Sequence, residues 1–332
     1  MEENILITGG AGFIGSHLAD ALINQDSHIY VFDNLSSGTL KNVKQHLHKA
    51  NFTFIKGDLL NLTDIKKLKC DHFELIFHLA ANSEVRIGST DPTIHFRQNI
   101  IATYNLLEQI RKRQSRPKII FTSTSTVYGD ASKIPTPEKY APLKPISTYG
   151  ASKLACEALI SAYAYTYDFN AVILRLANIV GPRSTHGVIY DFIQKLKNDP
   201  TELEILGDGT QTKSYLYIDD CIKAILYATE KSESQVEIYN ISSEDQIDVK
   251  TIAQIVIEEM HLKNVKLRFT GGINDGRGWR GDIKNMQLDI SKLKTLGWKP
   301  THNSKEAIRK AVKQVINQFE RYKLLERQST RS

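Results

Sequence analysis

A glycine-rich segment directly after the first apolar run limits the folds open to this chain. Asn4–Thr8 is typical of a short strand, and Thr8-Gly-Gly-Ala-Gly-Phe-Ile-Gly15 leads from it into a helical pattern over 12–24. Glycines allow a tight turn and a close approach of backbone to a pyrophosphate, and the helix N-terminus offers unpaired N–H groups. The position between a strand and a helix makes the pattern specific for a dinucleotide-binding turn. Its predicted contacts are Gly9, Gly12, Phe13, Ile14 and Gly15.

Strand and helix patterns alternate through the first half of the chain. Apolar strand-like runs follow at 29–32, 52–56, 75–79, 118–123 and 171–175, and helical patterns stand at 61–69, 92–113 and 147–167. Alternation of this kind predicts an α/β fold with a Rossmann-type doubly wound parallel sheet covered on both faces.

The alternation breaks after residue 178. Helical patterns at 188–197, 219–231, 249–260 and 304–326 mix with strand-like runs at 202–206 and 236–240 and a glycine-rich loop at 271–281. We therefore expect a dinucleotide-binding domain over 1–178, to which parts of 210–240 return. A smaller mixed α/β substrate lobe is expected over 179–326, and a frayed tail over 327–332.

The composition excludes several classes of protein. The 332 residues are 41% hydrophobic and 24% charged, and the net charge of +6 is spread along the chain without a basic stripe, so nucleic-acid binding is not expected. Cys70, Cys156 and Cys221 have no metal-ligand spacing, and we expect no metal. Sparse thiols, no leader-like start and no apolar run of about 20 residues predict a cytoplasmic protein without a membrane segment.

Asp33 follows the second strand-like run, about twenty residues after the glycines. A carboxylate there would accept hydrogen bonds from the adenosine ribose and would repel a 2′-phosphate, which favours NAD over NADP. The alternative is a turn or N-cap aspartate, since Asn34 and Ser36 stand beside it. Asp58, after the third strand, is a candidate for the adenine edge or a simple N-cap.

Tyr149 and Lys153 lie four residues apart in the helical pattern over 147–167, so both face one side of the helix. A free phenol has a pKa of about 10, and a nearby ammonium favours its ionised form. The pair can therefore act as a general acid and base. The hydroxyl-rich stretch Phe121-Thr-Ser-Thr-Ser-Thr-Val-Tyr-Gly129 ends the preceding strand and could hold the reacting oxygen of a substrate.

Together these segments resemble the extended short-chain dehydrogenase/reductases, and most closely the UDP-glucose 4-epimerase (UDP-galactose 4-epimerase) family. The resemblance covers nearly the whole chain. It rests on the following segments: Thr8–Gly15, Asp33–Gly38, Gly57-Asp58, His78–Ala81, Asn99, Ser123–Gly129, Tyr149–Lys153, Arg175–Asn178, Gly181–Arg183, Gly207–Gln211, Asp289–Lys292 and Leu296–Trp298.

The resemblance implies a tightly bound NAD+ and a transient oxidation of the sugar at C4. It implies that Tyr149 rests as a phenolate in the holoenzyme, held by Lys153 and the nicotinamide, and that Thr124 shares its substrate oxygen. It implies further cofactor contacts from Asn34, Ser37, Gly38, Asp58, Leu59, Leu79, Ala80, Ala81, Asn99 and Ser123. It implies substrate contacts from Thr126, Asn178, Val188, Lys213, Tyr215 and Arg277.

Related 4,6-dehydratases carry Asp and Glu where this chain has Ser125 and Thr126. Hydroxyls cannot supply that acid and base near neutral pH, so the resemblance disfavours dehydration. The sugar stays open among UDP-glucose/galactose, UDP-GlcNAc/GalNAc and UDP-glucuronate. A decarboxylase, a reductase and a non-enzymatic NAD-binding scaffold also stay open as functions. So do the roles of Arg183, His186 and Met286.

Family members commonly form homodimers through two long helices per subunit, here 92–113 and 147–167. Small and apolar residues on the second helix would face the neighbour, namely Ala155, Ala158, Leu159, Ala162 and Tyr163. The same face could instead be buried within one chain.

Overall fold

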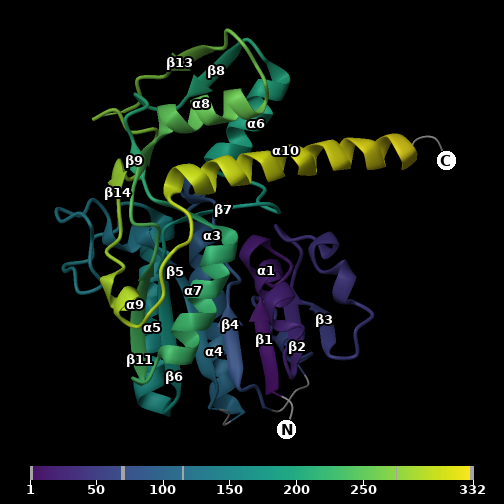
Figure 1. Ribbon diagram of the computed structural model, residues 1–332. Helices are drawn as coiled ribbons and strands as arrows, with labels where there is room; N and C mark the ends of the chain where they lie inside the picture. The colour runs from purple at the N-terminus through teal and green to yellow at the C-terminus, as the bar shows by residue number, and fades with distance from the viewer. Residues whose placement is uncertain (1–2, 69–71, 114–115, 274, 330–332) are drawn as a thin grey trace. The chain divides into compact units, whose positions relative to one another are not determined.

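Short apolar runs of the chain form a seven-stranded parallel sheet (Figure 1). The computed structural model describes residues 3–68, 72–113, 116–273 and 275–329. The strands are β1 (Glu3–Thr8), β2 (Ser27–Asp33), β3 (Phe52–Lys56), β4 (Leu75–His78), β5 (Lys118–Thr124), β6 (Asn170–Leu176) and β11 (Val236–Ile241). Their order is β11-β6-β5-β4-β1-β2-β3, and all pairs are parallel. The predicted Rossmann-type sheet is confirmed.

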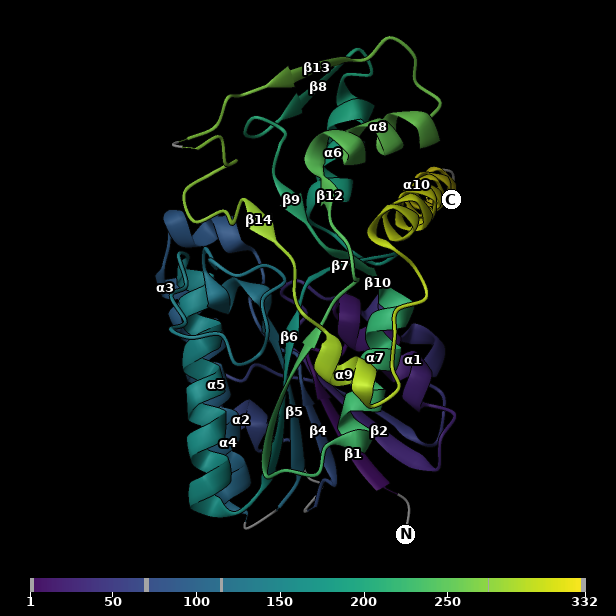
Figure 2. The same cartoon turned by 60° about the vertical axis from the view of Figure 1, so that its left-hand side comes forward.

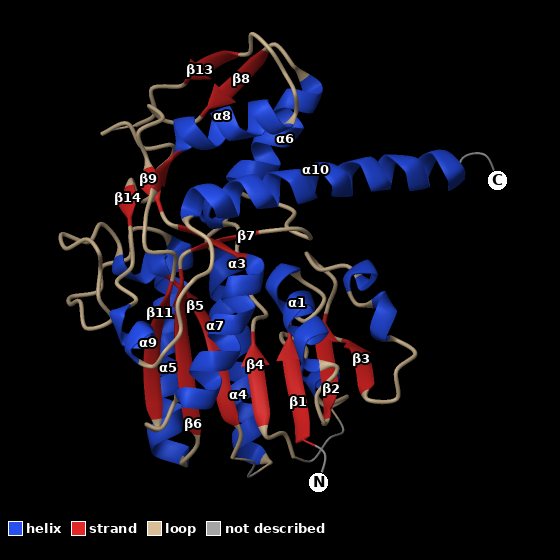
Figure 3. Cartoon of the chain, in the orientation of Figure 1, coloured by secondary structure: helices blue, strands red, loops and turns tan. Residues whose placement is uncertain are grey.

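The strand order reverses beside β1, whose neighbours are β2 on one side and β4 on the other. The strands of a parallel sheet end at one edge, which Figure 3 shows by the arrowheads of β1, β2, β3 and β4. Thr8, Asp33, His78 and Thr124 are the last residues of their strands. Ligands of doubly wound sheets bind outside this carboxyl edge, next to the reversal.

Helices cover both faces of the sheet (Figures 1 and 2). One face carries α1 (Phe13–Leu22) and the part of α7 (Ile218–Lys231) that belongs to this unit, and the other carries α4 (Ala102–Lys112) and α5 (Thr148–Tyr167). Side chains of β1, β4, β5, α4 and α5 share one apolar core. Across the described ranges, no helix is both long and apolar enough to cross a lipid bilayer.

Two helices predicted from the sequence have a different form in the structure. The predicted helix over 92–113 contains α3 (Thr93–His95), a π-helical turn η4 (Phe96–Ile101) and then α4. The segment over 61–69 forms only the short α2 (Leu62–Ile65), which Asn61 caps by accepting from the amide of Thr63. Residue 69 and Cys70 lie outside the described residues.

Contacts divide the chain into two units, and each is described by itself. The first comprises 1–176, 222–241 and 289–299, and the second 177–221, 242–288 and 300–332. The sequence pattern placed 289–299 in the second lobe. Lys292 of α9 (Ser291–Thr295) instead pairs with Glu237 and donates to the carbonyl of Ile238 at 2.7 Å, both on β11. These bonds join the segment to the first unit.

Short strands and helices make up the described residues of the second unit. Its elements are β7 (Asn178–Val180), α6 (Val188–Asn198), β8 (Glu202–Ile205), β9 (Thr212–Lys213), β10 (Tyr215–Tyr217), β12 (Ile247–Asp248), α8 (Val249–Glu259), β13 (Lys266–Phe269), β14 (Asn285–Met286) and α10 (Ser304–Ser329). The strands pair as β12-β9-β14, β10-β7 and β13-β8. The last helix passes the predicted boundary at 326, because its good helix formers continue to Ser329.

A buried ion pair joins α5 to the sheet. Arg175 of β6 contacts Glu157 of α5 through Nη2 and Oε2 at 2.7 Å, and the two side chains are 3% and 5% exposed. Ser123 donates its hydroxyl to Glu157, and Arg175 donates from Nη1 to the hydroxyl of Tyr128 at 3.0 Å. A charge that deep in a protein is stable only with its partner in place.

We predict that Glu157→Gln lowers the free energy of unfolding by about 3–5 kcal/mol, because it leaves the Arg175 guanidinium buried without its counter-charge. Urea denaturation of the purified protein measures the loss. Glu230→Gln is the control, since Glu230 pairs with Lys231 at the surface and a surface pair contributes about 0–1 kcal/mol. Equal losses in both variants would contradict the assignment.

Candidate active site

The glycine turn after β1 is packed so closely that only glycine fits. Gly9 has φ +69°, and a Cβ there would lie 2.7 Å from the amide nitrogen of Ala80. A Cβ on Gly15 would lie 2.3 Å from the carbonyl oxygen of Gly9. Gly12 precedes α1 and has no side chain to cap it, so the amides of the first turn keep no intrahelical partner. The turn is a backbone cradle suited to a dinucleotide pyrophosphate, such as that of NAD.

Asp33 is held against this turn by two backbone amides. Its Oδ2 accepts from the amide of Ala11 at 2.9 Å and its Oδ1 from the amide of Leu35 at 2.7 Å. Burial raises the pKa of Asp33, and the two amide hydrogen bonds oppose that rise. The carboxylate thus has the turn-forming role that was the alternative to a ribose contact. The ribose contact itself stays a prediction. The two amide bonds fix the position of the carboxylate for it.

The loop after Asp33 packs on the glycine turn at Ala11 and Gly12. Asn34 donates from Nδ2 to Oδ2 of Asp58 at 3.1 Å, and Oδ1 of Asp58 accepts from the amide of Leu60 at 2.8 Å. Gly38 packs so closely that a Cβ would lie 2.8 Å from the carbonyl carbon of Ala11. The structure therefore brings Asn34, Gly38 and Asp58 to the edge where Asp33 ends its strand. Ser37 lies in the same loop, and Leu59 directly after Asp58 is buried.

A buried histidine links the end of β4 to the glycine turn. Nδ1 of His78 lies 2.7 Å from Oγ1 of Thr8, and Nε2 lies 2.9 Å from Oγ1 of Thr103 on α4. Burial lowers the pKa of His78 to about 3, so the ring is neutral at physiological pH. The amide of Ala80 donates to Oγ1 of Thr8 at 3.3 Å. Leu79, Ala80 and Ala81 are thereby held beside the glycines.

The predicted base stands at the start of α5. Tyr149 is half-buried, and its hydroxyl is hydrogen-bonded to Thr124 at the end of β5. The Oγ1 of Thr124 also accepts from the amide and the hydroxyl of Thr126, both at 3.2 Å. The side chain of Lys153 is buried, and its ammonium lies 4.1 Å from the centre of the Phe121 ring. The structure brings together the three residues predicted to be catalytic.

Burial controls the protonation of this pair in the protein alone. It raises the pKa of Tyr149 to about 12, although the hydrogen bond to Thr124 opposes the rise. It lowers the pKa of Lys153 to about 8. The fold by itself therefore keeps the phenol protonated. The expected resting phenolate requires the additional positive charge that a bound nicotinamide ring supplies.

Asn99 in the π-helical turn connects two segments next to the base. Its Oδ1 accepts from the amide of Asn82 at 2.8 Å, and its Nδ2 donates to Oγ of Ser152 at 2.8 Å. Ser152 stands between Tyr149 and Lys153 and donates to the carbonyl of Tyr149 at 2.7 Å. Asn99 is buried, so its amide can reach a ligand only through these neighbours.

The side chain of Ser123 is engaged inside the protein, and its cofactor contact stays a prediction. Its hydroxyl donates to Glu157 in the buried ion pair, and the residue is 3% exposed. The side chain is therefore directed into the protein interior, and only the backbone of Ser123 is left for a cofactor.

The two cations among the predicted substrate residues of the second unit are already engaged with neighbouring carboxylates. Nζ of Lys213 lies 2.6 Å from Oδ1 of Asp282, and Arg277 donates to Asp275 at 2.7 and 2.9 Å and to the carbonyl of Asp282 at 3.0 Å. Met286 is paired with Lys213 between β14 and β9 and is buried. A phosphate in this unit would have to compete with the two carboxylates.

The remaining predicted residues of this unit lie near its short strands. Asn178 donates from Nδ2 to the carbonyl of Ser214 at 3.2 Å, which joins β7 to the residue before Tyr215. Tyr215 is buried, and Val188 is the first residue of α6. The amide of Arg183 donates to Oε1 of Gln318 at 2.7 Å, whereas His186 accepts through its carbonyl from Ser184.

Sequence reasoning missed two residues, one beside Tyr149 and one on the loop that carries Arg277. His95 lies on α3 with its ring centre 5.6 Å from that of Tyr149. Its position four residues before Asn99 was the available signal, because such residues share one helix face. Arg280 is an exposed cation on the loop that carries Arg277, two residues before Asp282.

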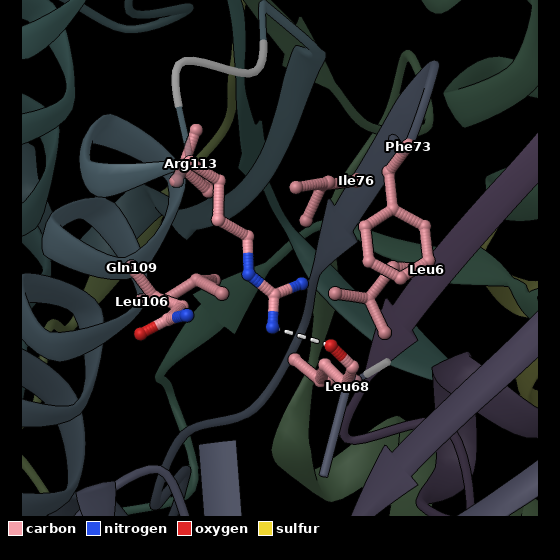
Figure 4. A pocket seen from close by; sticks show the side chains of 8 residues that line it. Leu6, Leu68, Phe73, Ile76, Leu106, Gln109 and Arg113 are labelled. Carbon is pink, nitrogen blue, oxygen red and sulfur yellow. Dashed lines mark hydrogen bonds between the residues drawn. The ribbon is translucent and has the colours of Figure 1, made fainter. Parts of the chain in front are cut away.

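An apolar cavity lies away from this edge, between the sheet and α4 (Figure 4). Leu6, Ile76 and Leu106 line it, and Arg113 points across it to donate to the carbonyl of Leu68. It brings together none of the groups predicted to bind a ligand. The candidate site is therefore at the carboxyl edge of the sheet.

Comparisons with known proteins agree with this geometry. Residues 5–242 match the model of the NAD dependent epimerase/dehydratase family. A UDP-galactose 4-epimerase is 40% identical, with a TM-score of 0.84 over 95% of this chain and 99% of that one. A UDP-N-acetylglucosamine 4-epimerase from Methanobrevibacter ruminantium is 31% identical, with a TM-score of 0.82 over 96% of this chain and 100% of that one. A UDP-glucuronic acid 4-epimerase from Bacillus cereus, solved with UDP-glucuronic acid and NAD, is 32% identical, with a TM-score of 0.84 over 95% of this chain and 99% of that one.

We predict that the phenol of Tyr149 stays protonated up to at least pH 9 in protein stripped of cofactor, because burial raises its pKa to about 12. The ultraviolet difference between the protein and its Tyr149→Phe variant, recorded across pH 6–10, measures the phenolate. Adding NAD should bring the phenolate signal to lower pH, since a positive ring favours the ionised form. Phenolate at pH 7 without cofactor would contradict the prediction.

We predict that Asp33→Asn weakens NAD binding about tenfold or more, or about 1.4 kcal/mol, because a charged hydrogen-bond acceptor is lost at the ribose. Calorimetric titration of the stripped protein with NAD measures the affinity. Asp26→Asn is the matched control, since Asp26 is exposed at the opposite end of β2. Equal affinity in both variants would show that Asp33 only forms its turn.

Proposed function

Because the chain belongs to the NAD-dependent epimerase/dehydratase family, we propose that it is a UDP-sugar 4-epimerase that interconverts UDP-glucose and UDP-galactose. The observation that carries the proposal is the hydrogen bond between Tyr149 and Thr124 beside the buried ammonium of Lys153. The contact supports the proposal because it joins a phenol and a second hydroxyl at the carboxyl edge of the sheet. Such a site can remove a proton from one substrate hydroxyl and return it.

Bound NAD would supply the chemistry that side chains lack, by accepting and returning the hydride at C4 of the sugar. The glycine turn and Asp33 would hold it. Tyr149, as phenolate, takes the proton of the 4-hydroxyl while Thr124 hydrogen-bonds the same oxygen. Lys153 stabilises the phenolate by its charge. After the keto sugar has turned its other face, Tyr149 returns the proton.

The neighbouring residues support epimerisation over dehydration. Removal of water across C5–C6 needs an acid and a base next to Thr124. Ser125 and Thr126 occupy those positions, and Ser125 is buried. Neither hydroxyl titrates near neutral pH, so the site can move only the proton handled by Tyr149. A product assay distinguishes epimerisation from decarboxylase and reductase activity.

The choice of UDP-glucose and UDP-galactose rests on the relative with 40% identity. Relatives that act on UDP-N-acetylglucosamine and UDP-glucuronic acid are about as similar in structure. Met286 is flexible by nature and could admit a larger 2-substituent, which keeps N-acetylhexosamines as the second candidate. We propose Asn178, Val188, Lys213, Tyr215 and Arg277 as contacts of the UDP-sugar, with Lys213 and Arg277 shared between phosphate and their present carboxylates.

We infer a homodimer formed through α4 and α5. These helices lie side by side on one face of the sheet (Figure 2), and large apolar side chains are exposed around them. Phe96 is 56% exposed, Tyr104 43% and Tyr165 67%. Light scattering that returned a monomer would reject the dimer. A cytoplasmic location stays a prediction from the sparse thiols, of which Cys156 and Cys221 are buried.

We predict that the holoenzyme converts UDP-galactose to UDP-glucose without added NAD, and that Tyr149→Phe lowers kcat at least about a hundredfold while NAD stays bound, because the variant loses only its base. Chromatography of the products and of the nucleotide released on denaturation measures both. Tyr165→Phe, which alters an exposed tyrosine of the same helix, is the control. Near-normal turnover by Tyr149→Phe would reject the mechanism. UDP-GlcNAc and UDP-glucuronate, assayed in parallel, identify the sugar.

A further inference from the structure

Two parallel hydrogen-bonded connections join the loop after β4 to α5. The first runs from Asn82 through Asn99 to Ser152. The second runs from Glu84 through His95 to Thr148. In each helix the two participating residues are four apart, so both connections lie on one face.

The positions next to Thr148 and Ser152 are the proposed base and its lysine. Tyr149 follows Thr148, and Lys153 follows Ser152. Each connection therefore ends one residue before a residue that acts in the reaction. The Asn99 connection fixes the helix at Lys153, and the His95 connection fixes it at its first turn.

The contacts of His95 define its protonation state. Its Nε2 lies 3.1 Å from the carbonyl oxygen of Glu84, which can only accept, so Nε2 carries the hydrogen. Its Nδ1 lies 2.9 Å from the hydroxyl of Thr148, and in the neutral ring it accepts from that hydroxyl. Because burial lowers the pKa of His95, the ring is neutral at neutral pH, with its proton on Nε2. A second proton on Nδ1 would abolish that acceptor.

His95 is buried, whereas Thr148 is exposed apart from its contacts with His95 and Gly88. His95 is 1% exposed, and its ring lies against that of Tyr149 at 60°. A Cβ on Gly88, in the turn η3 (Val85–Ser89), would lie 1.9 Å from Oγ1 of Thr148 and 2.8 Å from Nδ1 of His95. The turn therefore packs directly on the contact between His95 and Thr148.

We propose that His95 is a positioning residue for the Tyr149 base, and that it orients the phenol only in its neutral Nε2–H form. The proposal rests on the proposed function, because it assigns Tyr149 as the base. Displacement of a reacting group by about 1 Å can cost about a hundredfold in rate. His95 does not touch the substrate, and its effect passes through Thr148 and the start of α5.

A pH dependence follows from this form. The titratable groups that face His95 are the Glu84 carboxylate on the preceding turn, paired with Arg86, and the Tyr149 phenol on α5. Burial lowers the pKa of His95, while the carbonyl and the charge of Glu84 oppose the fall. The ring therefore gains its second proton only below the ordinary histidine pKa of about 6.5. Turnover should be full above that value and should fall on the acid side.

Three variants test the proposal in the NAD-loaded enzyme. His95→Phe fills the space without either hydrogen bond and should lower kcat about 10- to 100-fold, with KM and NAD content little changed. His95→Asn can present an oxygen near the place of Nδ1, so it should restore most of kcat and leave only the acid-side fall that belongs to protonation of the Tyr149 phenolate. Thr148→Val should lower kcat as His95→Phe does, and the double variant should lose no more than either single variant. His28→Gln is the control, since His28 binds Thr53 at the amino end of β2.

Nitrogen NMR of histidine-labelled holoenzyme, with His95→Asn for assignment, reads the tautomer independently of turnover. A neutral ring protonated on Nε2 is expected, and a ring protonated on Nδ1 or charged at pH 8 would overturn the proposal. Values of kcat within about twofold of wild type in His95→Phe would also overturn it, as would an unchanged acid-side fall in His95→Asn. If the wild type converts no UDP-sugar, the proposed function fails while the tautomer still tests His95.

Discussion

The buried contact between Glu157 and Arg175 is the interaction on which the site depends. Glu157 belongs to the helix that carries Tyr149 and Lys153, and Arg175 belongs to the sheet. Because a buried carboxylate cannot exchange its partner for water, the helix has one position relative to the sheet. Arg175 also reaches Tyr128, whose hydroxyl donates to Asn240 at 2.8 Å on β11. The ion pair thus fixes the hydroxyl-rich stretch, the helix and the edge strand together.

Desolvation gives the base its chemical character. Lys153 is buried and Tyr149 is half-buried, and desolvation favours the neutral form of each in the protein alone. A positive charge brought in with the cofactor changes that balance in favour of a phenolate beside an ammonium. In the proposed mechanism, the pair therefore becomes a base only when the cofactor is bound.

Much of the first unit could be predicted from the sequence, because its signals are local. The strands of a parallel sheet are continuous apolar runs, and Gly9 and Gly15 occupy places where no Cβ fits. The π-helical turn could not be predicted, since its composition resembles that of an α-helix. The direction of the Ser123 hydroxyl depends on Glu157, which is distant in the sequence. The pairing of Lys213 with Asp282 and the role of His95 likewise depend on partners far along the chain.

The π-helical turn over Phe96–Ile101 depends on the number of residues in this segment of the chain. A π turn holds one more residue than an α turn, and each residue of an α-helix advances the helix by about 100°. The extra residue therefore lets α4 keep its apolar face on the sheet while Asn99 and His95 reach the loop after β4. A homologue that had lost one residue here would need a different set of partners for its base helix. Changes of chain length within this segment should accordingly mark branches of the family with a rearranged site.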